Sequence, residues 1–271
     1  MVLSLLERGS IGEAVERWQN FLIGQDILKD VADGRFGQNT EDATKAYQRL
    51  KGLTPDGRVG SQTYAKALED GFDGVSIDPD FPPKPNFLPL VSTRDRQAIF
   101  GTFDYRSNPR PDNPEAIDIL GTWKSNNIIE VKLPNFQTIT GAPSSGEMTF
   151  HRLATPQLEG LWKAWQAKDL LSLILTFDGS FVPRYIRGSR TVLSNHAFGS
   201  AFDINYQWNK LGSVPALLGA RGSVRLLVPI ANEYGFYWGG HFNTRKDGMH
   251  FEVAKILNSA ELPALNRKYG I

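Results

Sequence analysis

Residues 194–203 read SNHAFGSAFD, and residues 247–252 read DGMHFE. Together the two stretches hold two of the chain's four histidines and two aspartates. A hydrolytic zinc ion takes three protein ligands from His and Asp or Glu, and it keeps a fourth position for water. We therefore predict a single metal site whose ligands are His196, Asp203 and His250.

The residues around these ligands favour one site built from two strands. Gly199 permits a turn between the first histidine and a strand that carries Asp203. In the second stretch, strand alternation places His250 and Glu252 on one face. Asp247 lies close enough in sequence to act as the general base that takes a proton from the metal's water. The alternative is that each stretch holds ordinary hydrogen-bonded side chains, because short patterns match by chance.

The combined pattern resembles the zinc D-alanyl-D-alanine carboxypeptidase and L-alanyl-D-glutamate endopeptidase family, which includes vancomycin-resistance D,D-peptidases and phage endolysins. Its motif is Ser-x-His-x-x-Gly-x-Ala-x-Asp, then Trp-Gly-Gly, then Asp-x-x-His-Phe. The matching residues are Ser194, His196, Gly199, Ala201, Asp203, Trp238, Gly239, Gly240, Asp247, His250 and Phe251. The resemblance implies zinc on the three predicted ligands and a catalytic carboxylate at Asp247. Aspartate rather than glutamate at that position is closer to the endopeptidase and endolysin branch.

Four further residues are candidates for substrate binding. Three arginines occur within residues 184–190, and arginine holds carboxylates by paired hydrogen bonds. The family resemblance favours Arg184 for this contact, with Arg187 second, whereas a solvated basic loop is an equal alternative for either. Ser194 could donate a hydrogen bond to substrate, and Trp238 could form a wall of the site, although tryptophan is more often core.

The two remaining histidines have weaker claims to the site. His151 lies far from both stretches in sequence, and we expect it to be structural. His241 lies near the second stretch and ranks below the three ligands, as a possible transition-state donor or extra ligand.

Composition limits the remaining possibilities. The chain of 271 residues is long enough for two domains, and its 30 basic and 29 acidic residues give no electrostatic case for nucleic acid. It has no cysteine, so only His and carboxylate remain as strong metal ligands. We find no signal peptide and no membrane span at the sequence level, and we expect a monomer.

The first 70 residues contain an internal repeat. DGRFGQNT at residues 33–40 recurs as DGRVGSQT at residues 56–63, each followed by a helical pattern. We expect Thr40 and Thr63 to cap those helices, and a helical stripe to pack on a first helix. The stripe consists of Ala43, Ala46, Tyr47 and Leu50. With Gln19 and the Tyr-Gln pair at 47–48, the pattern resembles the three-helix peptidoglycan-binding domain of wall hydrolases.

The rest of the chain completes a two-domain plan. Residues 1–70 form the three-helix module, residues 71–90 a stiff proline-rich tether, and residues 91–271 an α+β zinc peptidase domain with a central antiparallel sheet. Residues 100–105 and 128–133 are predicted strands, whereas residues 157–165 and 222–231 are predicted helices. We find no chemistry in residues 91–150.

The predicted function is that of a peptidoglycan hydrolase with one zinc ion, which acts as an L-alanyl-D-glutamate endopeptidase. A D-alanyl-D-alanine carboxypeptidase is a second reading, and a non-catalytic wall-binding protein with a structural zinc is a third. The donor set would also suit iron, manganese or cobalt. Without a signal peptide, the enzyme would be made in the cytoplasm and reach the wall by holin-type lysis or another non-classical route.

Overall fold

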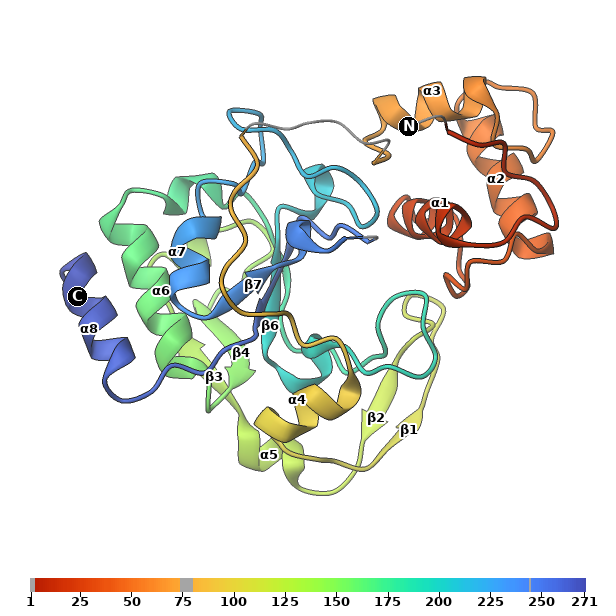
Figure 1. Ribbon diagram of the computed structural model, residues 1–271. Helices are drawn as coiled ribbons and strands as arrows, with labels where there is room; N and C mark the ends of the chain where they lie inside the picture. The colour runs from red at the N-terminus through yellow and green to blue at the C-terminus, as the bar shows by residue number, and fades with distance from the viewer. Residues whose placement is uncertain (1–2, 74–79, 244) are drawn as a thin grey trace.

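The computed structural model describes residues 3–73, 80–243 and 245–271. Figure 1 shows a small helical module at the N-terminal end beside a larger region of mixed helix and sheet. This is the α+β architecture that the sequence predicts. No helix within the described ranges is long and apolar enough to cross a membrane.

Three helices form the N-terminal module, α1 (Glu13–Gly24), α2 (Gln38–Leu50) and α3 (Ser61–Glu69). Their shared core is aromatic, and the Trp18 ring lies 5.3 Å from that of Phe21 and 5.6 Å from that of Tyr47. The predicted stripe on α2 is only half right, because Ala46 and Leu50 are exposed. Buried polar side chains take their places on the inner face of α2.

Two glutamines organise the repeated turns. The Gln19 side chain donates to Asp33 and Thr40 and accepts the Gly34 N–H at 2.8 Å. The Gln48 side chain makes the same set of contacts one repeat later, to Asp56, Arg58, Thr63 and Gly57. The prediction that Thr40 and Thr63 cap helices is therefore wrong. Glycines occupy both N-cap positions, and both threonines lie buried inside the first helical turn as acceptors for a glutamine.

Replacing Gln48 with alanine is expected to destabilise the second turn by about 2–3 kcal/mol. Gln48 is 2% exposed, so its removal leaves the Gly57 N–H and neighbouring polar groups without a partner in a buried place. Hydrogen exchange of residues 54–63 measures the loss. The matched change Gln62→Ala removes an exposed glutamine and should stay within about 0.5 kcal/mol of the parent. Equal exchange in both variants would contradict this role.

The larger region has a four-stranded antiparallel sheet in the order β5-β6-β8-β7 and two separate strand pairs, β1-β2 and β3-β4. Helices α6, α7 and α8 gather on one side of it (Figure 1). The strands are β1 (Tyr105–Ser107), β2 (Ile117–Ile119), β3 (Ile128–Lys132), β4 (Glu147–His151), β5 (Phe177–Gly179), β6 (Ala201–Ile204), β7 (Phe236–Trp238) and β8 (His250–Val253). The helices are α4 (Thr93–Phe100), α5 (Trp123–Asn127), α6 (Thr155–Ala167), α7 (Val228–Glu233) and α8 (Glu261–Tyr269).

Helix α6 seals the core side of the sheet. Its buried Trp165 ring packs edge to face on Phe202 of β6 and Phe251 of β8, at 6.2 and 6.0 Å. The Trp165 indole N–H donates to the Leu227 carbonyl, so the ring is buried without an unpaired polar atom. This packing fixes which face of β6 and β8 points away from the core.

Two predicted elements differ from the structure. The expected helix over 222–231 begins only at Val228, because Pro229 lacks the N–H of a helix interior and is tolerated in the first turn alone. The strand expected over 100–105 begins only at Tyr105, because Phe100 ends α4, whose N-terminus is fixed by a capping box between Ser92 and Asp95.

The proline-rich segment is not a free tether where the structure describes it. The Phe81 ring packs 5.3 Å from that of Trp238, and the Leu90 N–H donates to Glu252 at 2.9 Å. Residues 80–90 therefore run along the larger region toward α4 (Figure 1). Residues 74–79 of the predicted tether lie outside the described residues.

Candidate metal centre and active site

Strands β6 and β8 bring two of the predicted ligands face to face. They pair antiparallel with Asp203 opposite His250, so both side chains leave the same face of the sheet. On the other face, Phe202 and Phe251 stack at 5.5 Å in the core. The register is therefore fixed by an apolar face that would be exposed by a slip of one residue.

A short 3-10 helix, η3 (Asn195–Phe198), carries His196, the third predicted ligand. The Ser194 hydroxyl accepts the His196 N–H at 3.3 Å and so begins the turn. Gly199 ends it with φ of 64°, and a Cβ there would lie 2.7 Å from the Ile128 side chain. Glycine is required at this position both by the left-handed backbone and by the close neighbour.

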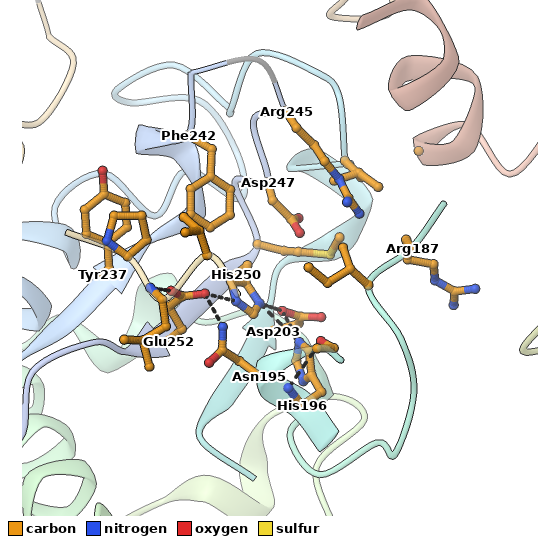
Figure 2. Close-up of a pocket in the computed structure, with 18 of the residues that line it drawn as sticks. Arg187, Asn195, His196, Asp203, Tyr237, Phe242, Arg245, Asp247, His250 and Glu252 are labelled. Carbon is orange, nitrogen blue, oxygen red and sulfur yellow. Dashed lines mark hydrogen bonds and ion pairs between the residues drawn. The ribbon is translucent and has the colours of Figure 1, made fainter. Parts of the chain in front are cut away.

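Three donor atoms converge in a buried cluster (Figure 2). His196 Nε2 lies 3.1 Å from His250 Nδ1 and 3.2 Å from Asp203 Oδ1, and the last two atoms are 2.9 Å apart. Zinc with tetrahedral bonds of about 2.0–2.1 Å needs ligand atoms about 3.3 Å from each other. The three residues therefore fit a bound zinc ion with little movement.

The outer nitrogen of each histidine has a defined partner. His196 Nδ1 donates to the Ser180 carbonyl at 2.7 Å, and His250 Nε2 donates to Glu252 at 3.1 Å. Glu252 is held in turn by the Asn195 amide at 2.5 Å. These contacts place the N–H outward on each ring and direct the other nitrogen at the cluster, as is usual for metal-binding histidine.

In the metal-free protein, burial and hydrogen bonds shift the pKa values of the three residues in the cluster. Burial lowers the pKa of His196. Burial also opposes charge on His250, but hydrogen bonds to Asp203 and Glu252 raise its pKa to about 10. Burial would raise the pKa of Asp203, yet the two histidines hold it well below its usual range. In the metal-free protein, His250 is therefore the histidine that carries a positive charge beside the Asp203 carboxylate.

Asp247 lies on the loop between η5 (Gly239–His241) and β8. Its N–H donates to the Gly239 carbonyl and its carbonyl accepts the His250 N–H, at 3.0 and 3.1 Å. Its Oδ1 is buried and makes no hydrogen bond to any described residue. Burial raises the pKa of Asp247 to about 6 in the metal-free protein, although His250 and two arginines favour the charged form.

The Trp-Gly-Gly run has a packing role beside this loop. A Cβ on Gly239 would lie 2.4 Å from the Asp247 carbonyl, and one on Gly240 would lie 2.3 Å from the Trp238 ring. The Trp238 indole N–H donates to the Gly248 carbonyl at 2.8 Å. The two glycines therefore let the loop that carries Asp247 approach the end of β7.

The cluster opens into a cavity of about 1100 Å³. Arg184, Arg245 and Asp247 all line it, and Figure 2 shows Arg245 directed toward the side on which Asp247 lies. Burial lowers the pKa of Arg184, although Asp203 favours its charge. Burial also lowers the pKa of Arg245 to about 10, although the nearby Asp247 carboxylate favours its charged form. Sequence reasoning missed Arg245, whose only signal is its place two residues before the predicted base.

The other three substrate-binding candidates lie in different environments. Arg187 lines the cavity but forms an ion pair with Glu115 at 3.2 Å, and Figure 2 shows it pointing away from the three ligands. Ser194 also lines the cavity, while its hydroxyl accepts the backbone N–H of His196. Trp238 is fully buried beneath the site. Tyr237 and Phe242 supply the aromatic wall that the sequence assigned to Trp238.

The two remaining histidines lie outside the cluster. His151 on β4 is buried between Phe100 and Trp123, and burial lowers its pKa to about 4. His241 Nε2 donates to the Pro82 carbonyl at 2.9 Å and so fastens the proline-rich segment. His151 is a packed side chain of the fold, whereas His241 also lines the cavity that Asp247 lines.

Two matches to known protein families support a peptidase that acts on peptidoglycan. Residues 187–253 match a family described as D-alanyl-D-alanine carboxypeptidase, and residues 11–67 match a putative peptidoglycan binding domain. The first match spans the three predicted ligands and Asp247, whereas Arg184 lies just before it. The two resemblances found in the sequence are thus confirmed as family matches.

One solved structure is similar to a small part of this chain. One solved structure, "The crystal structure of SleB N-terminal domain", is 28% identical over 26% of this chain and 96% of that chain, with a TM-score of 0.25. No curated protein matches the sequence.

Proposed function

We propose that this protein is a zinc peptidase that cleaves a stem-peptide bond of peptidoglycan, and that it acts as an L-alanyl-D-glutamate endopeptidase. The observation that carries the proposal is the meeting of three metal-donor atoms on one wall of a cavity that Asp247 also lines. Hydrolysis of a peptide bond needs both an activated water and a group that moves protons, and this wall provides a place for each.

His196, Asp203 and His250 would hold the ion. Bound zinc would acidify a water molecule and polarise the scissile carbonyl. Asp247 accepts the proton that the water loses as its oxygen attacks the carbonyl carbon. When the C–N bond breaks, Asp247 returns this proton to the leaving amine nitrogen. The Asp247 side chain is then a carboxylate again. Asp247 suits this role because its carboxylate lines the same cavity as the three donor residues.

Arg184 would hold a carboxylate of the stem peptide. Its guanidinium lines the cavity, and the one hydrogen bond that it makes to a described residue goes to the Tyr185 carbonyl at 3.2 Å. Most of its donors therefore remain available to a ligand. Arg187, by contrast, already pairs with Glu115.

Replacing Arg184 with alanine is expected to lower kcat/KM by about 10- to 100-fold, because hydrogen bonds to a charged group contribute about 1.5–3 kcal/mol each. Arg184→Lys should recover only part of this loss, since lysine cannot make the paired contact. Arg187→Ala is expected to cost less than about threefold. Steady-state kinetics on a soluble stem peptide measures all three. A larger loss at Arg187 than at Arg184 would reverse the assignment.

The cavity favours cleavage inside a chain. Its lining continues from the metal cluster to residues of the N-terminal module, so a substrate can extend past the scissile bond. A D-alanyl-D-alanine carboxypeptidase is the second candidate, because the family matched by residues 187–253 carries that description. It would need a closed end that receives the chain terminus.

Mass spectrometry of the fragments released from purified peptidoglycan tests these readings. New L-alanine carboxyl and D-glutamate amino ends are expected with the zinc-loaded protein, and they should be absent with a chelator or with Asp247→Ala. Release of terminal D-alanine alone would instead establish the carboxypeptidase. Binding to the wall without metal-dependent cleavage would leave the non-catalytic reading with a structural zinc.

A further inference from the structure

The cavity at the metal cluster has one wall made by the N-terminal module. Helix α1 and the loop after it contribute Glu16, Ile23, Gly24, Asp26, Leu28 and Lys29 to its lining. These residues are distant in sequence from the ligands, yet they border the same space. Figure 1 shows α1 facing the larger region, and Figure 2 shows a helix of the module beyond Arg245.

A loop of the larger region is seated in the module. Leu211 is 3% exposed and belongs to the module's own apolar core. A Cβ on Gly24 of α1 would lie 1.6 Å from the Leu211 carbonyl oxygen, and one on Gly212 would lie 2.5 Å from the Phe21 nitrogen. The Val214 N–H donates to the Gly71 carbonyl at 2.6 Å. Contact this close requires glycine on both sides. A casual contact between two tethered domains would not need glycine at either position.

The docked segments lead directly to the functional residues. The Ala32 N–H donates to the Gly188 carbonyl at 3.0 Å, within the segment that carries Arg184 toward the first ligand. The Gly212 N–H donates to the Lys246 carbonyl at 2.7 Å, next to Asp247. The module therefore contacts the first of these loops directly, and it contacts the second through the docked segment 211–214.

Charges on the module also act on the cavity. The Glu16 carboxylate favours the charged form of Arg245, and Asp26 acts on Tyr206. Asp26 and Lys29 form an ion pair beside them, so the module's wall offers charges of both signs. Such a wall suits a polar ligand that carries hydroxyl and amide groups.

We propose that the N-terminal module forms part of the substrate cleft, which takes a stem peptide still joined to its glycan. This inference rests on the proposed function and adds its substrate class. A cavity of about 1100 Å³ exceeds the space that a short peptide fills, and the region that matches a peptidoglycan binding domain provides its far wall. Recognition and cleavage then take place on one continuous piece of substrate.

Gly24→Leu separates the two parts without a direct change to the catalytic residues. Leucine favours a helix more than glycine does, so the module itself should keep its fold. The added side chain cannot fit against the Leu211 carbonyl, so the module must move away. Gly37→Leu is the matched control in the same module, because a Cβ at Gly37 meets nothing within 4 Å and its φ is −88°.

Two soluble substrates distinguish a cleft from a tether: a free stem peptide, and the same peptide joined to its disaccharide. With Gly24→Leu, the fall in kcat/KM is expected to be at least about tenfold larger for the disaccharide-linked peptide than for the free peptide, because only the linked sugar reaches the module. Gly37→Leu should match the parent on both. An equal loss on both substrates, or no loss on either, would overturn the proposal.

Readouts without catalysis separate this inference from the proposed function. Hydrogen exchange at residues 211–214 should rise in Gly24→Leu and not in Gly37→Leu. Calorimetry with the Asp247→Asn background should show weaker binding of the disaccharide-linked peptide by at least about tenfold when Gly24→Leu is added. If no peptide is cleaved by the parent, the proposed function fails while these measurements still decide the cleft. Unchanged hydrogen exchange or unchanged affinity in Gly24→Leu would overturn the proposal that the module forms part of the cleft.

Discussion

Asp247→Asn is expected to lower kcat by about 10²- to 10⁴-fold while the protein still binds one zinc ion. Asparagine keeps the size of the side chain and cannot take a proton from water at neutral pH. The Asp247 carboxylate, whose buried Oδ1 has no hydrogen-bond partner among the described residues, would lose its function as a base. Single-turnover cleavage of a stem peptide, with metal content measured on the same sample, gives both quantities.

The control for this change is Asp112→Asn, which alters the same chemical group at an exposed position outside the cavity. It should leave kcat unchanged. If Asp247→Asn retained more than about a tenth of the parent's kcat with zinc bound, another group would have to move the proton. Loss of the zinc itself would instead place Asp247 among the ligands.

Removal of the metal is expected to abolish cleavage, with a loss of more than about 10³-fold, because the ion supplies several kcal/mol of transition-state stabilisation. Added zinc should restore activity to the chelated parent. His196→Ala should bind no zinc at neutral pH and should not be rescued, because only two donor atoms of the cluster remain. Thermal unfolding should show zinc-dependent stabilisation in the parent and none in His196→Ala.

His241→Ala is the matched control for the ligand change. This histidine is as deeply buried as His196, but its Nε2 contacts the Pro82 carbonyl. The variant should therefore keep one zinc ion, even if the proline-rich segment loosens. Loss of zinc in His241→Ala, or full zinc content in His196→Ala, would show that the ligand set is wrong.

The local fold follows from the sequence where short-range chemistry decides it. The alternation of β8, the turn at Gly199 and the helix over residues 157–165 were all predicted correctly, because each depends on neighbours within a few residues. The errors come from polar groups with distant partners. Thr40 and Thr63 have the composition of helix caps, yet each accepts a hydrogen bond from a glutamine of the preceding helix.

The candidate site divides in the same way. His196, Asp203 and His250 could be selected from residue type and motif, and their donor atoms meet because the register of β6 and β8 places the last two opposite each other. Arg245 and Glu252 could not be given their roles from the sequence. One faces the cavity from a loop without periodicity, and the other is the partner of a ligand's outer nitrogen.

The sequence by itself determined the kind of chemistry: a cysteine-free chain with one His and carboxylate cluster, beside a repeated helical module. Only the tertiary structure decided how the parts are joined. Sequence patterns report which face of an element is apolar, but not which distant backbone it approaches. Gly24 looks like an ordinary end of a helix until the Leu211 carbonyl is placed against it, and that contact turns the expected tethered module into a wall of the cavity.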